Sequence, residues 1–170
     1  SVVSTFGVQG SGGGDEVTDL AAVRLHLDVN GDGLLDAGDP FIAGPGIYTA
    51  NDGQVLLAGF SREIAPGTSE LWLVTYDVAA GATGGDTFTA STAGAGTVAV
   101  SGKTSGLALI PVVPATSGGG LTVRGSLAAT LGASQPGAPN QALSNSSDAP
   151  AIQLVVTAGA GESVRLTALT

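Results

Sequence analysis

The residues with the clearest chemical signature lie in one run of twelve, residues 28–39. Side chains that carry oxygen occupy its positions 1, 3, 5, 9 and 12, which are Asp28, Asn30, Asp32, Asp36 and Asp39. Gly33 stands at position 6, where a calcium loop turns sharply, and Leu34 at position 7 can offer its backbone carbonyl. The spacing therefore predicts a Ca²⁺ site with Asp28, Asn30, Asp32, Leu34, Asp36 and Asp39 as its ligands.

The last position departs from the usual pattern, because Asp39 stands where a glutamate normally closes the loop. Its side chain is one methylene shorter, so the pattern predicts the ligands better than it predicts the affinity. The alternative interpretation is an acidic turn that binds nothing. Four carboxylates within twelve residues would repel one another without a cation, and this repulsion favours the calcium interpretation.

The flanks of the loop indicate what the ion would do. Val23, Leu25 and Leu27 alternate with Arg24 and His26 before the loop, which is a strand pattern, and Pro40 follows it directly. A calcium sensor needs a pair of helices that opens when the ion binds. The sequence therefore predicts a structural clip and not a switch.

The composition favours an all-β extracellular protein of one domain, or of one domain and a fraction. The chain has 170 residues, 28 of them glycine, with 11% charged residues. Cysteine is absent, so calcium could take over the role of disulfides. Methionine is absent too, which predicts a processed chain or an excerpt of a longer one. No run is long enough to predict membrane insertion, and no signal peptide is recognised.

Charge is distributed unevenly along the chain. The net charge of −9 argues against nucleic acid as a partner. Twelve of the fourteen acids fall within residues 15–86, whereas residues 87–170 hold few charges of either sign. Two explanations stay open for the second half: serine and threonine hydroxyls keep it soluble, or neighbouring copies or glycans cover it.

Strand-like runs separated by turn residues extend through the whole chain. They cover residues 2–8, 20–27, 54–60, 70–77, 86–91, 97–100, 107–113, 121–131, 152–157 and 163–169. No window keeps a helical period for three turns. The predicted fold is an antiparallel β-sandwich, Ig-like or jelly-roll-like, with an inserted EF-hand-like calcium loop. Residues 71–76 are largely apolar on both faces, which predicts the central strand there.

Glycine-rich segments suggest where the chain divides. Residues 10–14 and 115–120 are expected to be hinges or linkers. We accordingly assign residues 1–116 to the sandwich with the calcium loop, and residues 117–170 to a β segment that completes the same or a neighbouring sandwich. Residues 132–150 are expected to form an extended loop, in which Asn145 begins a formal N-glycosylation sequon.

Both ends of the chain have strand patterns without a cap or a polar tail. Residues 1–8 begin inside such a pattern and residues 163–170 stop inside one. One alternative is that these termini pair at the edges of their own sheet. The other, which we favour, is that a sandwich is completed between units, by covalent tandem repetition or by donation of a terminal strand to a neighbour.

Residues that could support catalysis are few. His26 is the only histidine and is expected to face outward beside Arg24. Residues 96–104 approach a phosphate-binding loop, but their glycine spacing is wrong, so a hairpin turn is predicted. Trp72 and Tyr76 share a strand face and could stack on a sugar ring, but we assign them to the core in preference to that role. The other acids considered as an acid–base pair or a second cation site are Asp15, Glu16, Asp19, Asp77 and Asp86.

At this point the chain resembles secreted β-sandwich modules of bacterial and archaeal surface and extracellular-matrix proteins. The resemblance covers about residues 15–115 and rests on the motifs AVRLHLDVNGDG at 22–33, DAGD at 36–39, IAPGT at 64–68, LWLVTYD at 71–77 and GDTFTA at 85–90. It implies tandem arrays, adhesion or polymeric surface structures. The loop alone is similar to that of a dockerin, but a dockerin duplicates its loop-plus-helix unit.

Together these observations predict a structural subunit of an extracellular filament or cell-surface array. Calcium would stabilise the unit, and β-strand complementation would join copies of the chain into a homopolymer, with glycans as a further possible partner. The alternative is an adhesin or carbohydrate-binding module of a larger secreted protein. An enzyme is the third choice, and the expectation is that the chain is not one.

Overall fold

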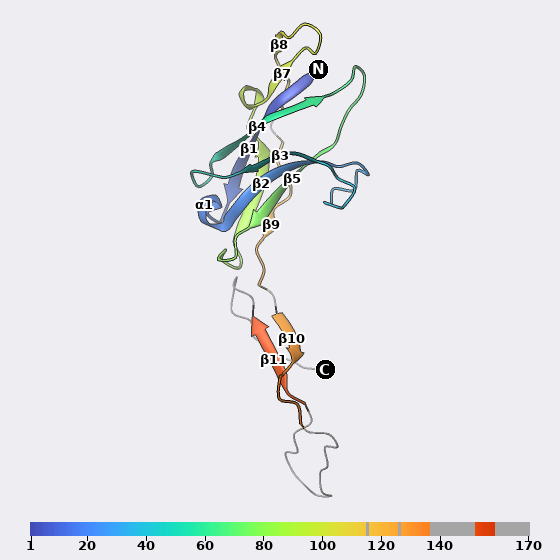
Figure 1. The fold of residues 1–170 in the computed structure, drawn as a ribbon. Coiled ribbons are helices and arrows are strands. Elements are labelled where there is room, and N and C mark those ends of the chain that lie inside the picture. The colour runs from blue at the N-terminus through green and yellow to red at the C-terminus, as the bar shows by residue number, and fades with distance from the viewer. Residues whose placement is uncertain (115, 126, 137–151, 159–170) are drawn as a thin grey trace, which may run out of the picture. The chain divides into compact units, whose positions relative to one another are not determined.

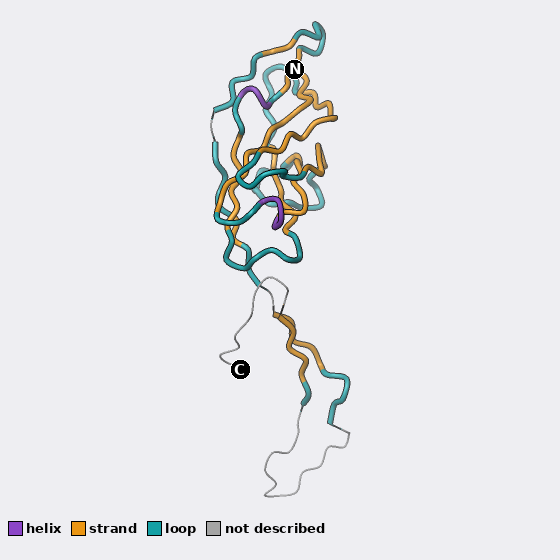
Figure 2. Tube along the Cα trace, turned by 90° about the vertical axis from the view of Figure 1, so that its left-hand side faces the viewer, coloured by secondary structure: helices purple, strands orange, loops and turns teal. Residues whose placement is uncertain are grey.

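The computed structural model describes residues 1–114, 116–125, 127–136 and 152–158. In these residues the protein is all-β and its sheets are antiparallel, as predicted. The helical segments described are one turn of α-helix, α1 (Glu16–Asp19), and a 3₁₀ turn, η1 (Ala95–Thr97), both purple in Figure 2. The chain divides into two compact units, Ser1–Val123 and Arg124–Thr170, and we describe each by itself.

The larger unit contains two sheets (Figure 1). The first has the order β8-β7-β1-β6-β9, with β4 also paired to β1; the second has the order β3-β2-β5. The strands are β1 (Val2–Gly12), β2 (Leu20–Leu27), β3 (Phe41–Gly46), β4 (Gln54–Glu63), β5 (Trp72–Val78), β6 (Thr87–Thr92), β7 (Ala99–Ser101), β8 (Ala108–Leu109) and β9 (Leu121–Thr122).

Strand β1 is the centre of the first sheet. It pairs with β4 along one edge and with β7 and then β6 along the other. The predicted hinge at residues 10–14 is wrong for its first half, because Gly10 to Gly12 continue β1 and pair with β6. Glycine is needed at this end of the strand: a Cβ on Gly12 would lie 2.0 Å from the carbonyl oxygen of Thr87. Here glycine serves close strand approach and not flexibility.

Strand β2 is the centre of the second sheet, and β5 forms its edge. The prediction that β5 is the central strand is therefore wrong. Its apolar pattern has another cause: Trp72, Val74 and Tyr76 pack against the core, while Leu73 and Thr75 on the opposite face are half-buried. An apolar sequence pattern indicates which faces of a strand are buried. It does not indicate whether neighbouring strands pair with both edges of that strand or with one.

The core draws on both sheets. Its buried members are Val8, Leu20, Val23, Leu25, Ala43, Tyr48, Val55, Leu57, Ala82, Phe88 and Val123. The two sheets come close together where β3 leads into β4. A Cβ on Gly46 would lie 2.4 Å from a methyl carbon of Val55 and 2.7 Å from one of Leu57, so only glycine fits this seam.

In the described part of the smaller unit, β10 (Leu127–Leu131) pairs with β11 (Leu154–Ala158) in an antiparallel ladder. The single strand predicted over residues 121–131 is interrupted: β9 ends at Thr122 and β10 begins at Leu127. The strand predicted at residues 163–169 and the sequon at Asn145 lie outside the described residues. The boundary predicted after residue 116 stays a prediction. Among the described residues, none of the helices has the length and apolar character that crossing a membrane requires.

Candidate cation site in the loop between β2 and β3

The predicted calcium loop connects β2 to β3, and its first residue anchors it to the second sheet. The Asp28 amide donates to the Leu71 carbonyl at 2.9 Å, which extends the pairing of β2 with the β5 side by one residue. The Asp28 carboxylate then accepts hydrogen bonds from Gly31 N at 2.7 Å and Gly33 N at 3.0 Å. Both glycines have φ near +75°, a left-handed conformation that turns their amides toward this carboxylate.

The last residue closes the loop on its beginning. One Asp39 carboxylate oxygen accepts from Val29 N at 3.0 Å, and the other accepts from Asp36 N at 3.1 Å. Asp28 and Asp39 are both buried, each about 9% exposed. The first and last predicted ligands therefore lie inside the loop, held by its own backbone amides.

The middle ligands meet at an amide group. Asn30 Nδ2 donates to an oxygen of Asp32 and to an oxygen of Asp36, each at 3.0 Å. The polar hydrogens of Asn30 thus stand between two carboxylates, where positive charge is favourable. To act as a ligand, Asn30 would turn its amide so that the oxygen takes this place.

The donor set has the chemistry that calcium prefers, because it consists of carboxylate, amide and carbonyl oxygens. The side chain of Leu34 is 67% exposed, so the backbone and not core packing places its carbonyl. The carboxylates are turned toward backbone amides, and nowhere in the described part of the chain do three or more acidic or histidine side chains gather around one metal position. Calcium at this loop therefore stays a prediction.

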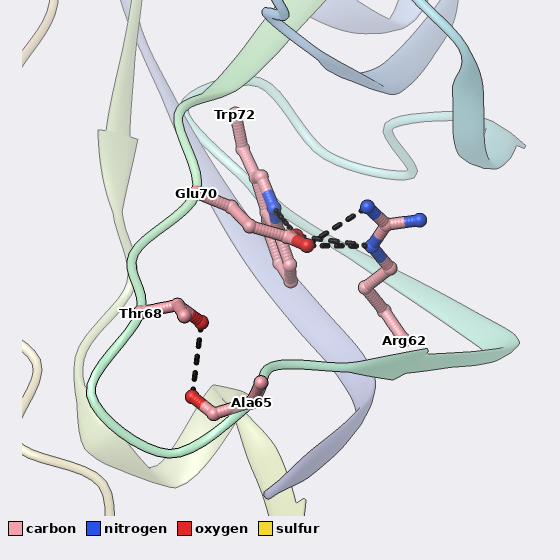
Figure 3. A network of polar contacts seen from close by, with 5 residues as sticks. All are labelled: Arg62, Ala65, Thr68, Glu70 and Trp72. Carbon is pink, nitrogen blue, oxygen red and sulfur yellow. Dashed lines mark hydrogen bonds and ion pairs between the residues drawn. The ribbon is translucent and has the colours of Figure 1, made fainter.

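A polar network that the sequence did not indicate borders the first residue of the loop. Glu70 accepts from Arg62 Nε at 3.0 Å, from Arg62 Nη2 at 2.8 Å and from Trp72 Nε1 at 2.8 Å (Figure 3). The bonds from Arg62, with a smaller contribution from Trp72, lower the pKa of the Glu70 carboxyl. Glu70 and Asp28 both line a cavity of about 350 Å³. The turn before Glu70 forms as predicted, with Thr68 Oγ1 donating to the Ala65 carbonyl at 2.9 Å.

A second unpredicted feature is a fully buried carboxylate in α1. Glu16 is 0% exposed, and one of its oxygens accepts from Asp52 N at 2.7 Å. The other oxygen, Oε1, has no hydrogen-bond partner in the described structure. Close by, the hydroxyls of Tyr48 and Tyr76 form a hydrogen bond of 2.9 Å, and burial raises the pKa of both phenols.

The remaining candidate acids do not form a second site. Asp15 caps α1 by accepting from Val17 N at 3.0 Å, and Asp19 accepts from Asp15 N at 3.2 Å. Asp77 makes an ion pair with Arg24 on the other strand of its ladder, and Asp86 belongs to the turn before β6. Only Asp15, Glu16 and Asp19 share one element, because the short helix brings them together.

The other residues considered from the sequence have structural surroundings. His26 lies on the Arg24 face of β2, but the prediction that it faces solvent is wrong: it is buried beside Phe41, at 5.7 Å between ring centroids. Trp72 packs against Phe6 and Phe60, in agreement with a core role. The hairpin turn predicted over residues 96–104 is found only at the end of that range: residues 102–107 form the turn between β7 and β8, while residues 99–101 are β7 itself.

Comparison with known protein families, with curated proteins and with solved structures finds no match to this chain.

Proposed function

We propose that this chain is a calcium-stabilised structural subunit of an extracellular filament or tandem surface array. In this proposal the two sheets of the larger unit form a β-sandwich, and calcium clips the loop that leaves the central strand β2. The observation that carries the proposal is the loop itself. Its first and last carboxylates, Asp28 and Asp39, are buried and are held by backbone amides from within the loop.

A structural role for the ion is supported by what the loop connects. It joins two neighbouring strands of one sheet, β2 and β3, and Val23 and Leu25 of β2 are 0% exposed. Neutralising the loop carboxylates would favour the closed connection over an open one. The free energy gained from this neutralisation would stabilise the sheet. It would not be used to open a pair of helices, because no described helix pair lies beside the loop.

Association with other copies is supported by apolar surface that a lone unit leaves in water. Ile110 and Val112 after β8 are almost fully exposed, and Leu154, Val155 and Val156 are exposed on β11. The segments around them carry few charges. Exposed apolar strands of this kind are typical of surfaces that a partner covers.

The test of the calcium site is a titration of the full chain with Ca²⁺ in a calorimeter. We expect saturable binding of one ion, and for Asp28→Asn or Asp32→Asn a loss of affinity of at least about tenfold, close to 1.4 kcal/mol. Asp52→Asn is the matched control: it removes one charge at an exposed turn residue with φ of 50°, a conformation that asparagine tolerates. No binding to the wild type, or an equal loss in the control, would refute the assignment.

The test of assembly is light scattering and negative-stain microscopy of the same chain, with calcium and then with excess chelator. We expect large oligomers or filaments that dissolve or soften when calcium is withdrawn. A compact monomer under both conditions would contradict the structural proposal, and retention of that monomer on glycan would support a carbohydrate-binding module instead.

A further inference from the structure

The second sheet ends at β3 on one side and at β5 on the other. Strand β5 ends the order β3-β2-β5, and within the described residues no strand pairs with its outer edge. The Leu71 carbonyl accepts from Asp28 N and the Ala79 amide donates to the Asp19 carbonyl, so odd-numbered residues of this segment bond toward β2. In an antiparallel ladder the alternate residues point the other way. The amides and carbonyls of Trp72, Val74 and Tyr76 therefore face outward.

The free edge of β5 borders an apolar groove. A cavity of about 720 Å³ lies beside β5, lined on that strand by Trp72, Val74 and Tyr76 and across from it by Phe6, Phe88 and Leu121. None of the residues that line it is charged. A strand placed next to β5 would send every second side chain into this groove and would bury apolar surface on both sides.

The smaller unit contains a strand with matching properties. Leu154, Val155 and Val156 of β11 are 39–48% exposed, and neither β10 nor β11 contains a charged residue. Gly132 N donates to the Gln153 carbonyl at 2.9 Å, so by alternation the amides of Leu154, Val156 and Ala158 point away from β10. A hairpin of two strands is marginal by itself and gains stability when a further strand pairs with it.

We propose that β11 of a second copy of the chain pairs with the free edge of β5, giving a sheet of order β3-β2-β5-β11-β10. This inference rests on the proposed function and names its contact. The net charge of −9 favours an uncharged strand in this uncharged groove. An acidic strand would be repelled by the acidic partner chain, and its carboxylates would be buried in the groove without a cationic partner. The other edges left unpaired in the described sheets of the larger unit fit less well: β8 and β9 have two residues each, β3 contains Pro45, which has no amide to donate, and β4 ends in charged residues.

The contact would join unlike surfaces. In this proposal each chain supplies one acceptor edge, on β5, and one donor edge, on β11. When the donor of one copy binds the acceptor of the next, the same contact can be repeated indefinitely. The series closes into a ring only if the rotation between copies divides a full turn, so the expected product is an open filament. The groove also includes Gly33 of the calcium loop, which places the acceptor next to the proposed ion.

The experiment uses variants of the full chain that block one edge each. Val156→Pro removes an outward amide of β11 and leaves its ladder with β10 intact, whereas Ala129→Pro does the same at the free edge of β10 and is its matched control. Val74→Lys places a charge in the acceptor groove, and Leu109→Lys on β8 is its control. Val74→Pro is a second acceptor variant, because the Val74 amide points away from β2. Circular dichroism establishes that each variant is folded.

We expect Val156→Pro and Val74→Lys each to remain monomeric under conditions in which the wild type and both controls assemble. An equimolar mixture of the two blocked variants should give a dimer and nothing larger, because one intact donor and one intact acceptor remain. Assembly of Val156→Pro equal to that of the wild type, or blocked variants that do not pair when mixed, would overturn this inference and leave the proposed function standing. A wild type that stays monomeric would overturn both.

Discussion

Glu16 is the residue whose surroundings depart furthest from what its type would suggest. It is fully buried, and its bonded oxygen ties α1 to the turn between β3 and β4 through Asp52 N. Its second oxygen has no hydrogen-bond partner in the described structure, and it lies so near Gly10 that a Cβ there would be 3.0 Å from both this oxygen and the Tyr48 ring. A buried carboxylate with a single partner is costly, so the backbone bond to Asp52 must matter locally.

Substitutions of Glu16 measure that bond. Glu16→Ala removes the shorter of the two bonds from the Asp52 amide, leaving only Asn51 Oδ1 at 3.1 Å, and opens a cavity, for which we expect a loss of about 2–4 kcal/mol in the free energy of unfolding. Glu16→Gln keeps an oxygen for Asp52 and removes the buried charge, so its loss should be smaller than that of alanine. Urea denaturation of the three proteins makes the comparison. An alanine variant as stable as the wild type would show that the bond contributes nothing.

At this scale, local spacing could be read from the sequence and tertiary partners could not. The positions of Asp28, Asn30, Asp32, Asp36 and Asp39 follow from a pattern within twelve residues, and all of them do lie in one loop. The burial of Glu16 depends on Asp52, 36 positions away. Likewise, His26 is covered by Phe41 from a strand whose presence the sequence did not indicate.

Among the elements, the connection from β4 to β5 is held by charge as well as by packing. Arg62 near the end of β4 forms a paired contact with Glu70, and the same carboxylate accepts from Trp72 at the start of β5. The contact lowers the pKa of Glu70 and raises that of Arg62. It therefore positions Trp72, the first residue of β5.

The lowered pKa of Glu70 predicts a pH dependence. A carboxyl whose folded-state pKa is lowered stabilises the fold fully above its unfolded value of about 4.3, and this contribution is lost as the pH falls through the folded-state value. Arg62 is partly exposed to solvent, so we expect Glu70→Gln to cost about 1 kcal/mol at pH 7 and to lose its effect in acid. Thermal unfolding at pH 7 and at acid pH tests this. Unchanged stability at pH 7, or a difference that persists in acid, would contradict it.

The elements themselves were predictable where side-chain alternation is strong. The bounds of β2 agree with the prediction, because apolar and polar residues alternate from Val23 to Leu27. Strand β3 was missed because it contains two glycines and a proline, residues that normally mark turns. Residues 121–131 were predicted as one strand since Val123, Arg124 and Gly125 continue a plausible pattern. Alternation alone does not reveal that β9 ends at Thr122, with Val123 still bonded to Asp86, and that β10 begins only at Leu127.

For the whole molecule, calcium should act as a ligand that binds the folded state alone. At a free concentration about 100 times Kd, such a ligand adds about 2.7 kcal/mol to the free energy of unfolding. For a chain of this size we expect a rise in Tm of about 5–10 °C. Calorimetric scans with calcium and with chelator test this, with Asp28→Asn as the variant that should not respond. An equal rise in that variant would point to binding elsewhere.

Gly46 has a consequence for direction. Its lack of a side chain lets β3 and β4 close one flank of the core, while the flank beside β5 stays open. A unit whose core is closed on one flank and open on the other presents different surfaces on its two sides. Units joined through the open flank would all have the same orientation, so the array would be polar, with a different surface exposed at each end. A free copy of β11 could then bind at only one end, the end that exposes an unoccupied β5 edge.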